Sequence, residues 1–310
     1  MTTEQNRERD RHGVVPGSIV VGVDGSESSG RAIDWAIDQA VAEHRPIALA
    51  HAVAGPVAVW HDPNGSDHRV GLEGARTEAQ QVLEDARAEV ERRAPGLEVH
   101  EVQRVVDPRD LLLELSADAA MVVLGSRGRG PVRSLLLGSV GVAVTRHAKC
   151  PVVVMRPGNP GLVRQGVVVG ADGTELSLPT LEFAYRQASL RDLPLTVLHC
   201  VWDAEAATAG AHIVAEGAGL EEQRMLLAES MSGMTEKFPD VRVRSEIARG
   251  MPDDCLVRLG ERMNLVVVGA HHGGAASSVL FGSVAASVVE HATCPVAVVP
   301  LAPQPQEQPV

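Results

Sequence analysis

The sequence predicts an α/β fold in two tandem domains, each built on a parallel sheet with flanking helices. The second half of the chain repeats the first. Asp24 reappears in matching surroundings as Asp172, 148 positions later, and Gly125 reappears as Gly269, 144 positions later. A repeat of this length is far longer than a solenoid unit and corresponds to a domain. Within each copy, short β-branched runs alternate with longer amphipathic stretches, which is typical of a parallel sheet with right-handed crossovers.

The first copy contains five predicted strands, and runs such as MVVLG are apolar throughout, as expected for strands covered on both faces. The strands are expected at Ile19–Val23, Ile47–Val53, Leu97–Val105, Met121–Gly125 and Val152–Met155. Between the first two, apolar residues recur at helical spacing from Ile33 to Val41. A longer charged helix is expected from Ala75 to Arg93, and Pro108 stands where the next helix begins.

The second copy repeats this order of elements. Its strands are expected at Val167–Gly170, Leu195–Val201, Val241–Ile247, Leu265–Gly269 and Val296–Val299. Pro252, the equivalent of Pro108, again marks the start of a helix. The same α/β architecture is therefore expected twice.

The repeat sets the domain boundaries. Residues 17–158 form the first predicted domain and residues 159–302 the second, joined by a short link near Pro157–Gly161. Residues 1–16 lack apolar periodicity and residues 303–310 are of low complexity, so both are expected to be flexible tails. The polar stretch Trp60–His68 is expected to form a loop after the second strand.

Composition excludes several classes of protein. A formal charge of −12 argues against nucleic-acid binding, which needs a basic surface, and 2% aromatic residues leave few stacking platforms. No apolar run approaches the ~18 residues of a membrane span. The first residues are polar and unlike a secretory signal, and the four cysteines show no CxxC spacing. A cytoplasmic protein without a metal site is expected.

A glycine-rich loop follows the fourth strand of the first copy. It reads Gly125-Ser126-Arg127-Gly128, then nine residues, then Gly138-Ser139. Glycines let the backbone approach a ligand and adopt positive φ. Main-chain N–H groups of the loop, and of a helix beginning near Gly138, would bind an anion such as a phosphate. The alternative is a turn that only connects the strand to the helix.

This loop carries a family resemblance. The pattern G-x2-G-x9-G-S is that of the nucleotide-binding members of the universal stress protein family, and the segments VGVDGS, LAHAV and CPVVVMRP are also similar to that family. The resemblance extends over both repeats. It implies two Rossmann-like domains of the adenine nucleotide α-hydrolase-like type, each with a five-stranded parallel sheet in the order 3-2-1-4-5. It also implies that ATP is bound, with Mg²⁺.

The family pattern and the predicted topology place the site in the first copy. Ligands of such sheets bind where the strand order reverses, here at the carboxyl ends of the first and fourth strands. The resemblance implies that Asp24 lies by the adenosine or its metal, although a DGS sequence is also a turn signal. The nucleotide-binding residues expected are Val23, Asp24, Ala52, Gly125, Arg127, Gly128, Gly138, Ser139 and Val140.

The second copy departs from this pattern. His272 replaces the second glycine. The loop of the first copy carries Arg127, Arg129 and Arg133, whereas the loop of the second copy carries only His271 and His272. Less fixed positive charge should weaken the binding of a polyphosphate, so the second site is expected to bind ATP weakly or to hold another ligand. Its equivalent residues are Asp172, Cys200, Gly269, Gly282, Ser283 and Val284.

Three functions follow from these observations. The resemblance implies an ATP-binding regulator of the stress response or growth arrest, acting on a regulatory protein partner. A slow ATPase or nucleotide-transfer enzyme would need a base beside the phosphates, for which Asp24 is the only obvious candidate, so no catalytic residue is assigned. A nucleotide-free dimerisation scaffold is the third, and the second copy is closer to it than the first.

The last strand of each copy, Pro151–Met155 and Pro295–Val299, should form a sheet edge, and exposed edges invite pairing. In relatives this edge pairs two domains about a pseudo-two-fold axis. We therefore expect such a pseudo-dimer within the chain, and association of two chains into a homodimer.

Overall fold

The structure is a computed structural model that describes most of both repeats. The described residues are 14–53, 68–128, 137–157, 165–202, 213–214, 220–270 and 278–301. Most of the predicted N-terminal tail, residues 60–67 of the predicted loop and the tail 303–310 lie outside them. Within the described part of the chain, no helix has the length and apolar character needed to cross a membrane.

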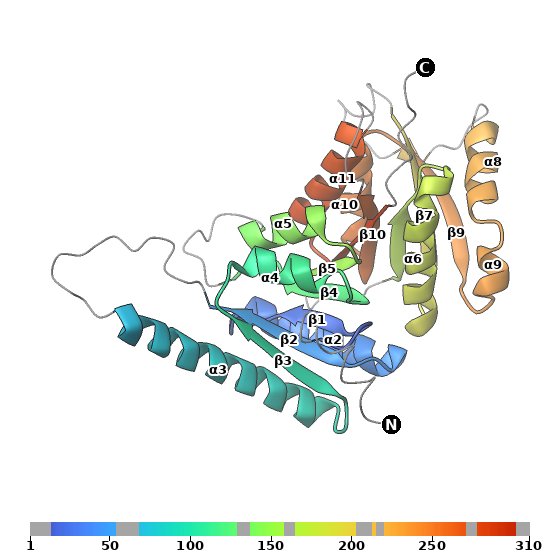
Figure 1. Cartoon of the computed structure of the whole chain (residues 1–310). Coiled ribbons are helices and arrows are strands. Elements are labelled where there is room, and N and C mark those ends of the chain that lie inside the picture. The colour runs from blue at the N-terminus through green and yellow to red at the C-terminus, as the bar shows by residue number, and fades with distance from the viewer. Residues whose placement is uncertain are drawn as a thin grey trace, which may run out of the picture. The chain divides into compact units, whose positions relative to one another are not determined.

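The chain divides into two compact units, Met1–Met155 and Arg156–Val310, each containing one copy of the repeat (Figure 1). The division directly follows the strand that closes the first repeat. Each unit contains strands that alternate with helices, as an α/β domain does.

The first unit has a five-stranded parallel sheet in the order β3-β2-β1-β4-β5. Ile19 of the first strand is in register with Ile47 on one side and with Met121 on the other. The strand order therefore reverses between β1 and β4. The strands are β1 (Ile19–Gly22), β2 (Ile47–Ala52), β3 (Val99–Arg104), β4 (Met121–Gly125) and β5 (Val152–Met155).

Helices cover both faces of this sheet. Two of them, α2 and α3, pack on one face, whereas α4 and α5 pack on the other (Figure 1). This arrangement leaves the carboxyl ends of β1 and β4 between helices that diverge to opposite faces. The helices are α2 (Glu27–Glu43), α3 (His68–Arg93), α4 (Pro108–Leu115) and α5 (Ser139–His147).

Local sequence explains where these helices begin. The Ser26 hydroxyl accepts a hydrogen bond from the Ser29 N–H at 3.1 Å and so caps α2. The Asp107 carboxylate caps α4 in the same way, and Pro108 occupies the first turn, where a missing N–H costs nothing. The buried stripe of α2 has helical spacing and consists of Ala32, Ile33, Ala36, Ile37 and Ala40.

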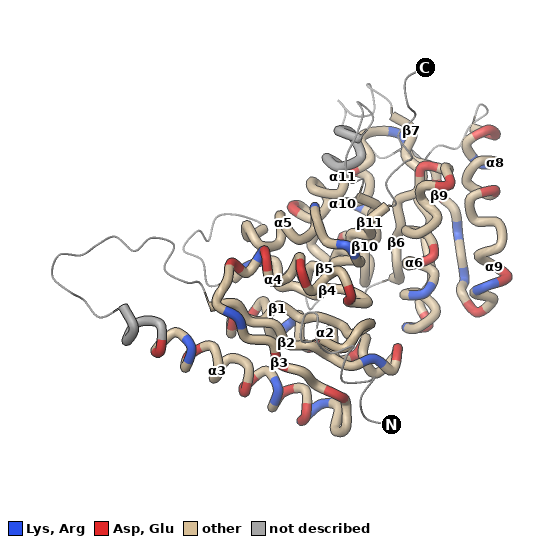
Figure 2. The backbone as a smooth tube through the Cα atoms, in the orientation of Figure 1, with Lys and Arg blue, Asp and Glu red and all other residues tan. Residues whose placement is uncertain are grey.

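The core of the first unit is aliphatic. Ile19, Val20 and Val21 of β1 are fully buried, as are Val122 and Val123 of β4. Figure 2 shows that charged residues lie along α3, whereas the central strands β1 and β4 contain none. The sheet is therefore covered on both faces, as the apolar runs of the sequence predict.

The second unit repeats this plan in the order β9-β7-β6-β10-β11. The five predicted strands are parallel, and a two-residue strand, β8, which was not predicted, pairs antiparallel to β9, so the sheet is mostly parallel. The strands are β6 (Val167–Gly170), β7 (Leu195–Val201), β8 (Ile213–Val214), β9 (Val243–Arg249), β10 (Leu265–Ala270) and β11 (Val296–Pro300).

The helices of the second unit differ from those of the first between β7 and β9. Where the first unit has the long helix α3, the described part of the second has two short helices separated by a turn that includes Gly233, which adopts φ 80°. A left-handed glycine ends a helical run because the chain cannot continue as an α-helix through it. The helices are η1 (Glu175–Ser177), α6 (Leu178–Leu190), α8 (Glu221–Ser230), α9 (Met234–Lys237), α10 (Pro252–Gly260) and α11 (Ser278–His291).

Two predicted strands shift in the structure. The strand expected from Leu97 starts at Val99, because Gly96 adopts φ 89° in the turn before it. The strand expected at Val241–Ile247 runs instead over Val243–Arg249, since its last residues pair with β7 on one side and with β8 on the other. Both shifts concern the ends of strands and leave the arrangement of the sheet unchanged.

Candidate functional site

A cavity of about 520 Å³ lies at the carboxyl ends of β1 and β4 in the first unit. This is the position at which the strand order reverses, so the two helices that follow these strands leave it on opposite faces. All nine residues predicted for the first site line the cavity. They are Val23, Asp24, Ala52, Gly125, Arg127, Gly128, Gly138, Ser139 and Val140.

Asp24 forms one corner of the cavity. Its Oδ1 accepts a hydrogen bond of 3.0 Å from the Ser26 N–H, and Gly25 between them adopts φ 73°. This is the turn that a DGS sequence favours. Oδ2 points the other way, to within 2.5 Å of the place that a Cβ atom on Gly128 would occupy. One carboxylate thus holds the turn and also faces the glycine-rich loop.

The glycines of the loop are needed for close approach, not for positive φ. Gly125 and Gly128 are not among the described glycines with positive φ, so the loop does not use the left-handed backbone that glycine permits. A Cβ atom on Gly125 would lie 2.6 Å from the main-chain carbon of Ser28. The end of β4 therefore packs directly on the first turn of α2, which fixes the loop beside that helix.

The loop is further tied to the start of α2. The Arg127 N–H donates to the Ser28 hydroxyl, and the Ser26 hydroxyl donates to the Arg127 carbonyl, each at 3.4 Å. These contacts hold the backbone of Arg127 while its side chain is exposed to solvent at the rim. The guanidinium can therefore approach an anion in the cavity while the backbone of Arg127 stays in position.

The N-terminus of α5 forms the opposite wall. Gly138 is the residue before the helix, and its N–H donates to the Ser126 carbonyl at 2.9 Å. The first N–H groups of a helix have no partner within it, and the helix dipole adds partial positive charge there. Ser139, Val140 and Gly141, all in this first turn, line the cavity. Their main-chain donors make this wall suited to an anion.

Ser126 is a site residue that the sequence reasoning missed. It lines the cavity and is 1% exposed, and its buried hydroxyl has no hydrogen-bond partner within the described part of the chain. Burying a hydroxyl without a hydrogen-bond partner costs free energy. A ligand that forms a hydrogen bond with the hydroxyl removes that cost. The loop pattern alone does not distinguish Ser126 from any other residue between two glycines, so nothing in the sequence marks it.

The remaining wall is apolar and was also not predicted. Leu111 and Leu112 of α4 are almost fully buried and line the cavity, together with Pro108 and Leu124. On the strand side, the His51 ring holds the Val23 carbonyl through its Nδ1 at 2.6 Å. The cavity therefore has an apolar end beside α4 and a donor-rich end at α5. Pro108, which marks the start of α4 in the sequence, is a signal from which α4 could have been predicted to line the site.

The second unit reproduces part of this geometry. Asp172 Oδ1 accepts hydrogen bonds from the Thr174 N–H and hydroxyl at 2.9 and 2.8 Å, around Gly173 with φ 82°. Gly269 again packs closely on the following helix face, since a Cβ atom there would lie 2.9 Å from Thr180 Oγ1. The turn and the close packing are therefore common to both repeats.

The helix after β10 differs from its counterpart. Gly138 directly precedes α5, but α11 begins at Ser278, so the equivalent residue Gly282 lies inside the helix together with Ser283 and Val284. A helix of this length tolerates one interior glycine at a cost of about 1 kcal/mol. N–H groups beyond the first four of a helix donate within the helix, so these positions do not supply the free donors expected of them. His271 and His272 lie outside the described residues, as do Arg129 and Arg133.

Cys200, the counterpart of Ala52, ends up beside another thiol. A hydrogen bond joins it to Cys255 of α10. This contact lowers the pKa of Cys255 and raises the pKa of Cys200, because one thiol donates to the other. The position equivalent to Ala52 therefore carries a thiol, and a second thiol lies beside it.

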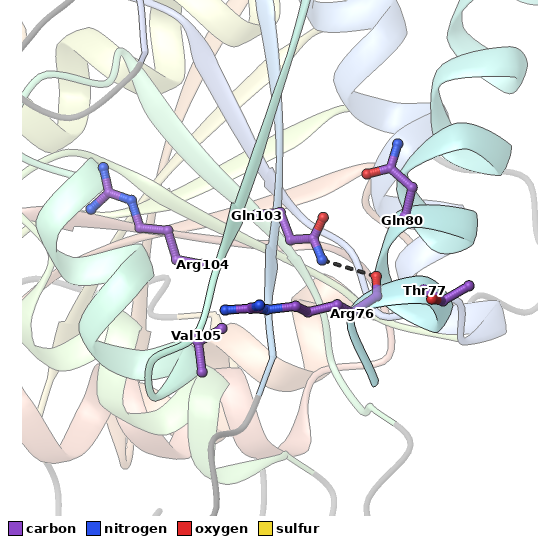
Figure 3. A pocket seen from close by; sticks show the side chains of 6 residues that line it. All are labelled: Arg76, Thr77, Gln80, Gln103, Arg104 and Val105. Carbon is purple, nitrogen blue, oxygen red and sulfur yellow. Dashed lines mark hydrogen bonds between the residues drawn. The ribbon is translucent and has the colours of Figure 1, made fainter. Parts of the chain in front are cut away.

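A second hollow of the first unit, of about 670 Å³, lies between the start of α3 and the end of β3 (Figure 3). Gln103 Nε2 donates to the Arg76 carbonyl at 3.0 Å, and Arg104 pairs with Glu114 at 2.7 Å. None of its lining residues is buried. It is an open surface groove whose polar groups are exposed to solvent. It is therefore less suited than the cavity at β1 and β4 to enclose a ligand. Its lining is Arg76, Thr77, Gln80, Gln103, Arg104 and Val105.

Comparison with known proteins agrees with the repeat. The profile of the universal stress protein family matches residues 17–156 and 164–300. A universal stress protein of Mycolicibacterium smegmatis is 34% identical over 290 residues, 91% of this chain and 96% of that protein. One of Mycobacterium tuberculosis is 33% identical over 306 residues, 94% of this chain and 98% of that protein.

A solved structure shares the fold of the whole chain. The universal stress protein of Archaeoglobus fulgidus superposes with a TM-score of 0.67 at 18% identity, covering 91% of this chain and 98% of that chain. Both repeats match the family and relatives match along nearly the full length. The chain is therefore a tandem two-domain member of the universal stress protein family.

Proposed function

We propose that the first unit binds ATP with Mg²⁺ in the cavity at the carboxyl ends of β1 and β4. We further propose that occupancy regulates a protein partner in a stress or growth-arrest response. The observation that carries the proposal is the convergence of all nine predicted residues on one cavity of about 520 Å³. That volume lies within the range typical of small-molecule sites, ~300–1,000 Å³.

The two ends of the cavity suit the two ends of a nucleotide. Leu111, Leu112 and Pro108 give an apolar surface for a purine ring, and the backbone at Ala52 supplies polar main-chain groups beside it. At the other end, the N-terminus of α5 and the Ser139 hydroxyl supply donors for phosphate oxygens. A ligand with a flat apolar group and an anionic tail fits this polarity.

Two groups line the cavity between these ends. The Ser126 hydroxyl is buried and has no hydrogen-bond partner among the described residues, and a ribose or phosphate oxygen would supply one. Asp24 Oδ2 faces Gly128, and a carboxylate oxygen is a ligand that Mg²⁺ accepts beside phosphates. Bound Mg²⁺ would neutralise part of the phosphate charge. Asp24 would orient it, or the ribose, against the loop.

We favour the binding of ATP without rapid hydrolysis. Hydrolysis needs a group that positions an attacking water and a cation that stabilises the transition state. Asp24, the only obvious base in the sequence, already holds the turn to Ser26 through Oδ1. The slow-ATPase alternative therefore predicts, at most, a low rate that depends on Asp24.

The second unit is proposed to bind ATP more weakly than the first. Gly282 and Ser283 lie within α11, so they do not supply the main-chain donors that the first turn of α5, beginning at Ser139, offers in the first unit. A scaffold role in the homodimer is the second proposal for this unit. Loss of nucleotide binding leaves such a role unaffected.

Isothermal titration calorimetry of the full chain with Mg-ATP tests this function. One tight site is expected, and Asp24→Ala should weaken it at least tenfold. Asp34→Ala is the matched control, because Asp34 is an aspartate on α2 that pairs with Arg93 at 2.6 Å, away from the cavity. Two equally tight sites would refute the division between the units, and absence of binding by the intact protein would refute the function.

A further inference from the structure

The outer strand of the first unit is β3, which has β2 on one edge and no strand on its other edge among the described residues. The carbonyls of Glu98 and Arg104 accept hydrogen bonds of 2.9 and 2.8 Å from N–H groups on the β2 side. Successive residues of a strand turn their main-chain groups to opposite edges, so those of Gln103 point away from β2. An edge of this kind presents donors and acceptors with which another chain can pair.

The second unit shows what this edge accepts. There, β8 pairs antiparallel with the end of β9, and Ile213 lies opposite Arg249. Arg249 is the equivalent of Val105, which directly follows β3. The registers of the two repeats also agree, because Arg104 pairs with Ala52 and the equivalent residues of the second unit pair in the same way. The same place on the sheet therefore carries a strand in the second unit.

In the first unit this place is a groove. The surface groove of about 670 Å³ lies against the end of β3 and is lined by Gln103, Arg104 and Val105 on the strand side. Gln103 Nε2 donates to the Arg76 carbonyl at 3.0 Å and ties α3 to the strand. Figure 3 shows the Arg76 side chain extending from α3 past Gln103 towards Val105. An extended segment laid along the strand end would meet this side chain.

The lining of the groove indicates the chemistry of its ligand. It contains two arginines and no carboxylate, although the chain has a formal charge of −12. Arg104 pairs with Glu114 at 2.7 Å, whereas Arg76 is exposed and forms no ion pair with the residues that the structure describes. Val105 and Val106 beside them are 38% and 39% exposed. A ligand with one acidic and one apolar side chain complements this surface.

We propose that the groove at the end of β3 binds an extended segment of a partner protein, which pairs antiparallel with Gln103 and Val105. The segment carries an acidic side chain for Arg76 and an apolar side chain for Val105. Main-chain hydrogen bonds provide the affinity of such strand addition, and the side chains provide its specificity. The inference concerns the edge of the sheet and does not depend on nucleotide binding in the cavity.

A peptide from the chain itself is a suitable probe. Residues 209–218 contain Ile213 and Val214 of β8, the strand that pairs at the equivalent place, followed by one acidic residue, Glu216. The labelled peptide is titrated into the full-length protein and followed by fluorescence anisotropy. Saturable binding is expected. Hydrogen exchange measured by mass spectrometry should slow in residues 99–105 when the peptide is bound.

Two modified peptides test the main-chain pairing. The Arg242 carbonyl accepts from the Leu195 N–H at 2.9 Å on the β7 side, so Arg249, seven residues later, turns its main chain to the outer edge. The N–H of Ile213 opposite it therefore faces the paired strand, and that of Val214 faces away. A peptide N-methylated at Ile213 should not bind. One N-methylated at Val214 should bind as well as the unmodified peptide.

Protein variants test the groove. Arg76→Glu should weaken binding about threefold, as expected for one exposed charge pair. Arg92→Glu is the matched control, because it makes the same change in charge on α3 at a residue that pairs with Glu89 and does not line the groove. Gln103→Pro should abolish binding, since proline removes the outward N–H and is tolerated on an edge strand. Val99→Pro, at the other end of β3, should bind normally.

Other results would overturn the proposal. Equal affinity of the two N-methylated peptides would exclude main-chain pairing. Slowed exchange in residues 243–249 in place of 99–105 would mean that the peptide replaces β8. Absence of binding by the parent protein would show that the edge is not open to a partner. If the peptide dissociated a dimer in sedimentation experiments, a second copy of the chain would be the occupant, which would also contradict the proposal.

Discussion

The Asp24 carboxylate lies 2.5 Å from the point at which a Cβ atom on Gly128 would stand. The two residues come from the end of β1 and from the loop after β4, and the parallel pairing of these strands brings them together. Any side chain at Gly128 must therefore displace the carboxylate that the proposed site uses. This explains the requirement for glycine there without invoking a left-handed backbone.

Gly128→Ala should weaken Mg-ATP binding about tenfold, which corresponds to roughly 1.4 kcal/mol. The added methyl group pushes Asp24 Oδ2 out of place, yet the free energy of unfolding should change by less than about 0.5 kcal/mol because Gly128 is exposed. Calorimetry and urea denaturation measure the two effects. Gly30→Ala is the control, since a Cβ atom on Gly30 of α2 meets no atom within 4 Å. Unchanged affinity of the Gly128 variant would count against the role of Asp24.

Gly125→Ala should instead destabilise the fold, by about 1–3 kcal/mol. Its Cβ atom would lie 2.6 Å from the main-chain carbon of Ser28, and backbone cannot move aside as a side chain can. Gly138→Ala should cost less, because the nearest atom to its Cβ lies 3.8 Å away. Urea denaturation of the two variants separates these effects. Equal stability would show that β4 does not pack on α2 as described.

Ser126→Ala should weaken Mg-ATP binding several-fold while leaving the protein as stable as before, or more stable by up to about 1 kcal/mol. The variant removes a buried hydroxyl that has no partner in the unliganded protein. Ser18→Ala is the contrasting control, because the buried Ser18 hydroxyl donates to the Val15 carbonyl and its loss should destabilise the unit. A stability loss in both variants would mean that the Ser126 hydroxyl has a structural partner.

Asp107 should make the stability of the first unit depend on pH. Hydrogen bonds from the Arg109 side chain, and then from its backbone N–H, lower the pKa of Asp107 from 3.8 to about 2. A lowered folded-state pKa stabilises the fold above pH ~4 and loses that contribution as the pH falls towards 2. The Asp107 side chain is 35% exposed, so solvent screening reduces the contribution to about 1 kcal/mol or less.

Asp107→Ala should therefore reduce the free energy of unfolding by about 1 kcal/mol at pH 7, through loss of the α4 cap. The difference from the parent protein should shrink between pH 4 and pH 2. Asp107→Asn keeps a capping acceptor and removes the charge, so it should lose less than the alanine variant. Urea denaturation across this pH range measures the difference, and a gap that is constant with pH would contradict the assignment.

Much of the fold could be predicted from the sequence because its signals are local and repeated. Apolar runs such as Met121–Gly125 define central strands, and Pro108 marks a helix start that the structure keeps. The two repeats support each other, since each strand position is found twice. The short strand β8 carried no such signal, because two residues are too few for a period.

The parts of the site that follow from a local sequence pattern could be predicted. The parts that follow from contacts between distant segments could not. The loop pattern placed Gly125 and Gly138 at the cavity, but it could not show that Gly125 contacts Ser28, since that contact depends on how β4 packs on α2. The contact between Cys200 and Cys255 was not foreseen for the same reason. Cys200 and Cys255 lie far apart in sequence and meet only through the packing of α10 on β7.

The structure of the full chain crystallised with Mg-ATP tests the central claim most directly. The account predicts a nucleotide in the first unit with its adenine beside Ala52 and Leu111. Its phosphates should lie at the N-terminus of α5 and at Ser139, within reach of the Ser126 hydroxyl. A nucleotide bound elsewhere, or a cavity that stays empty at saturating Mg-ATP, would contradict it.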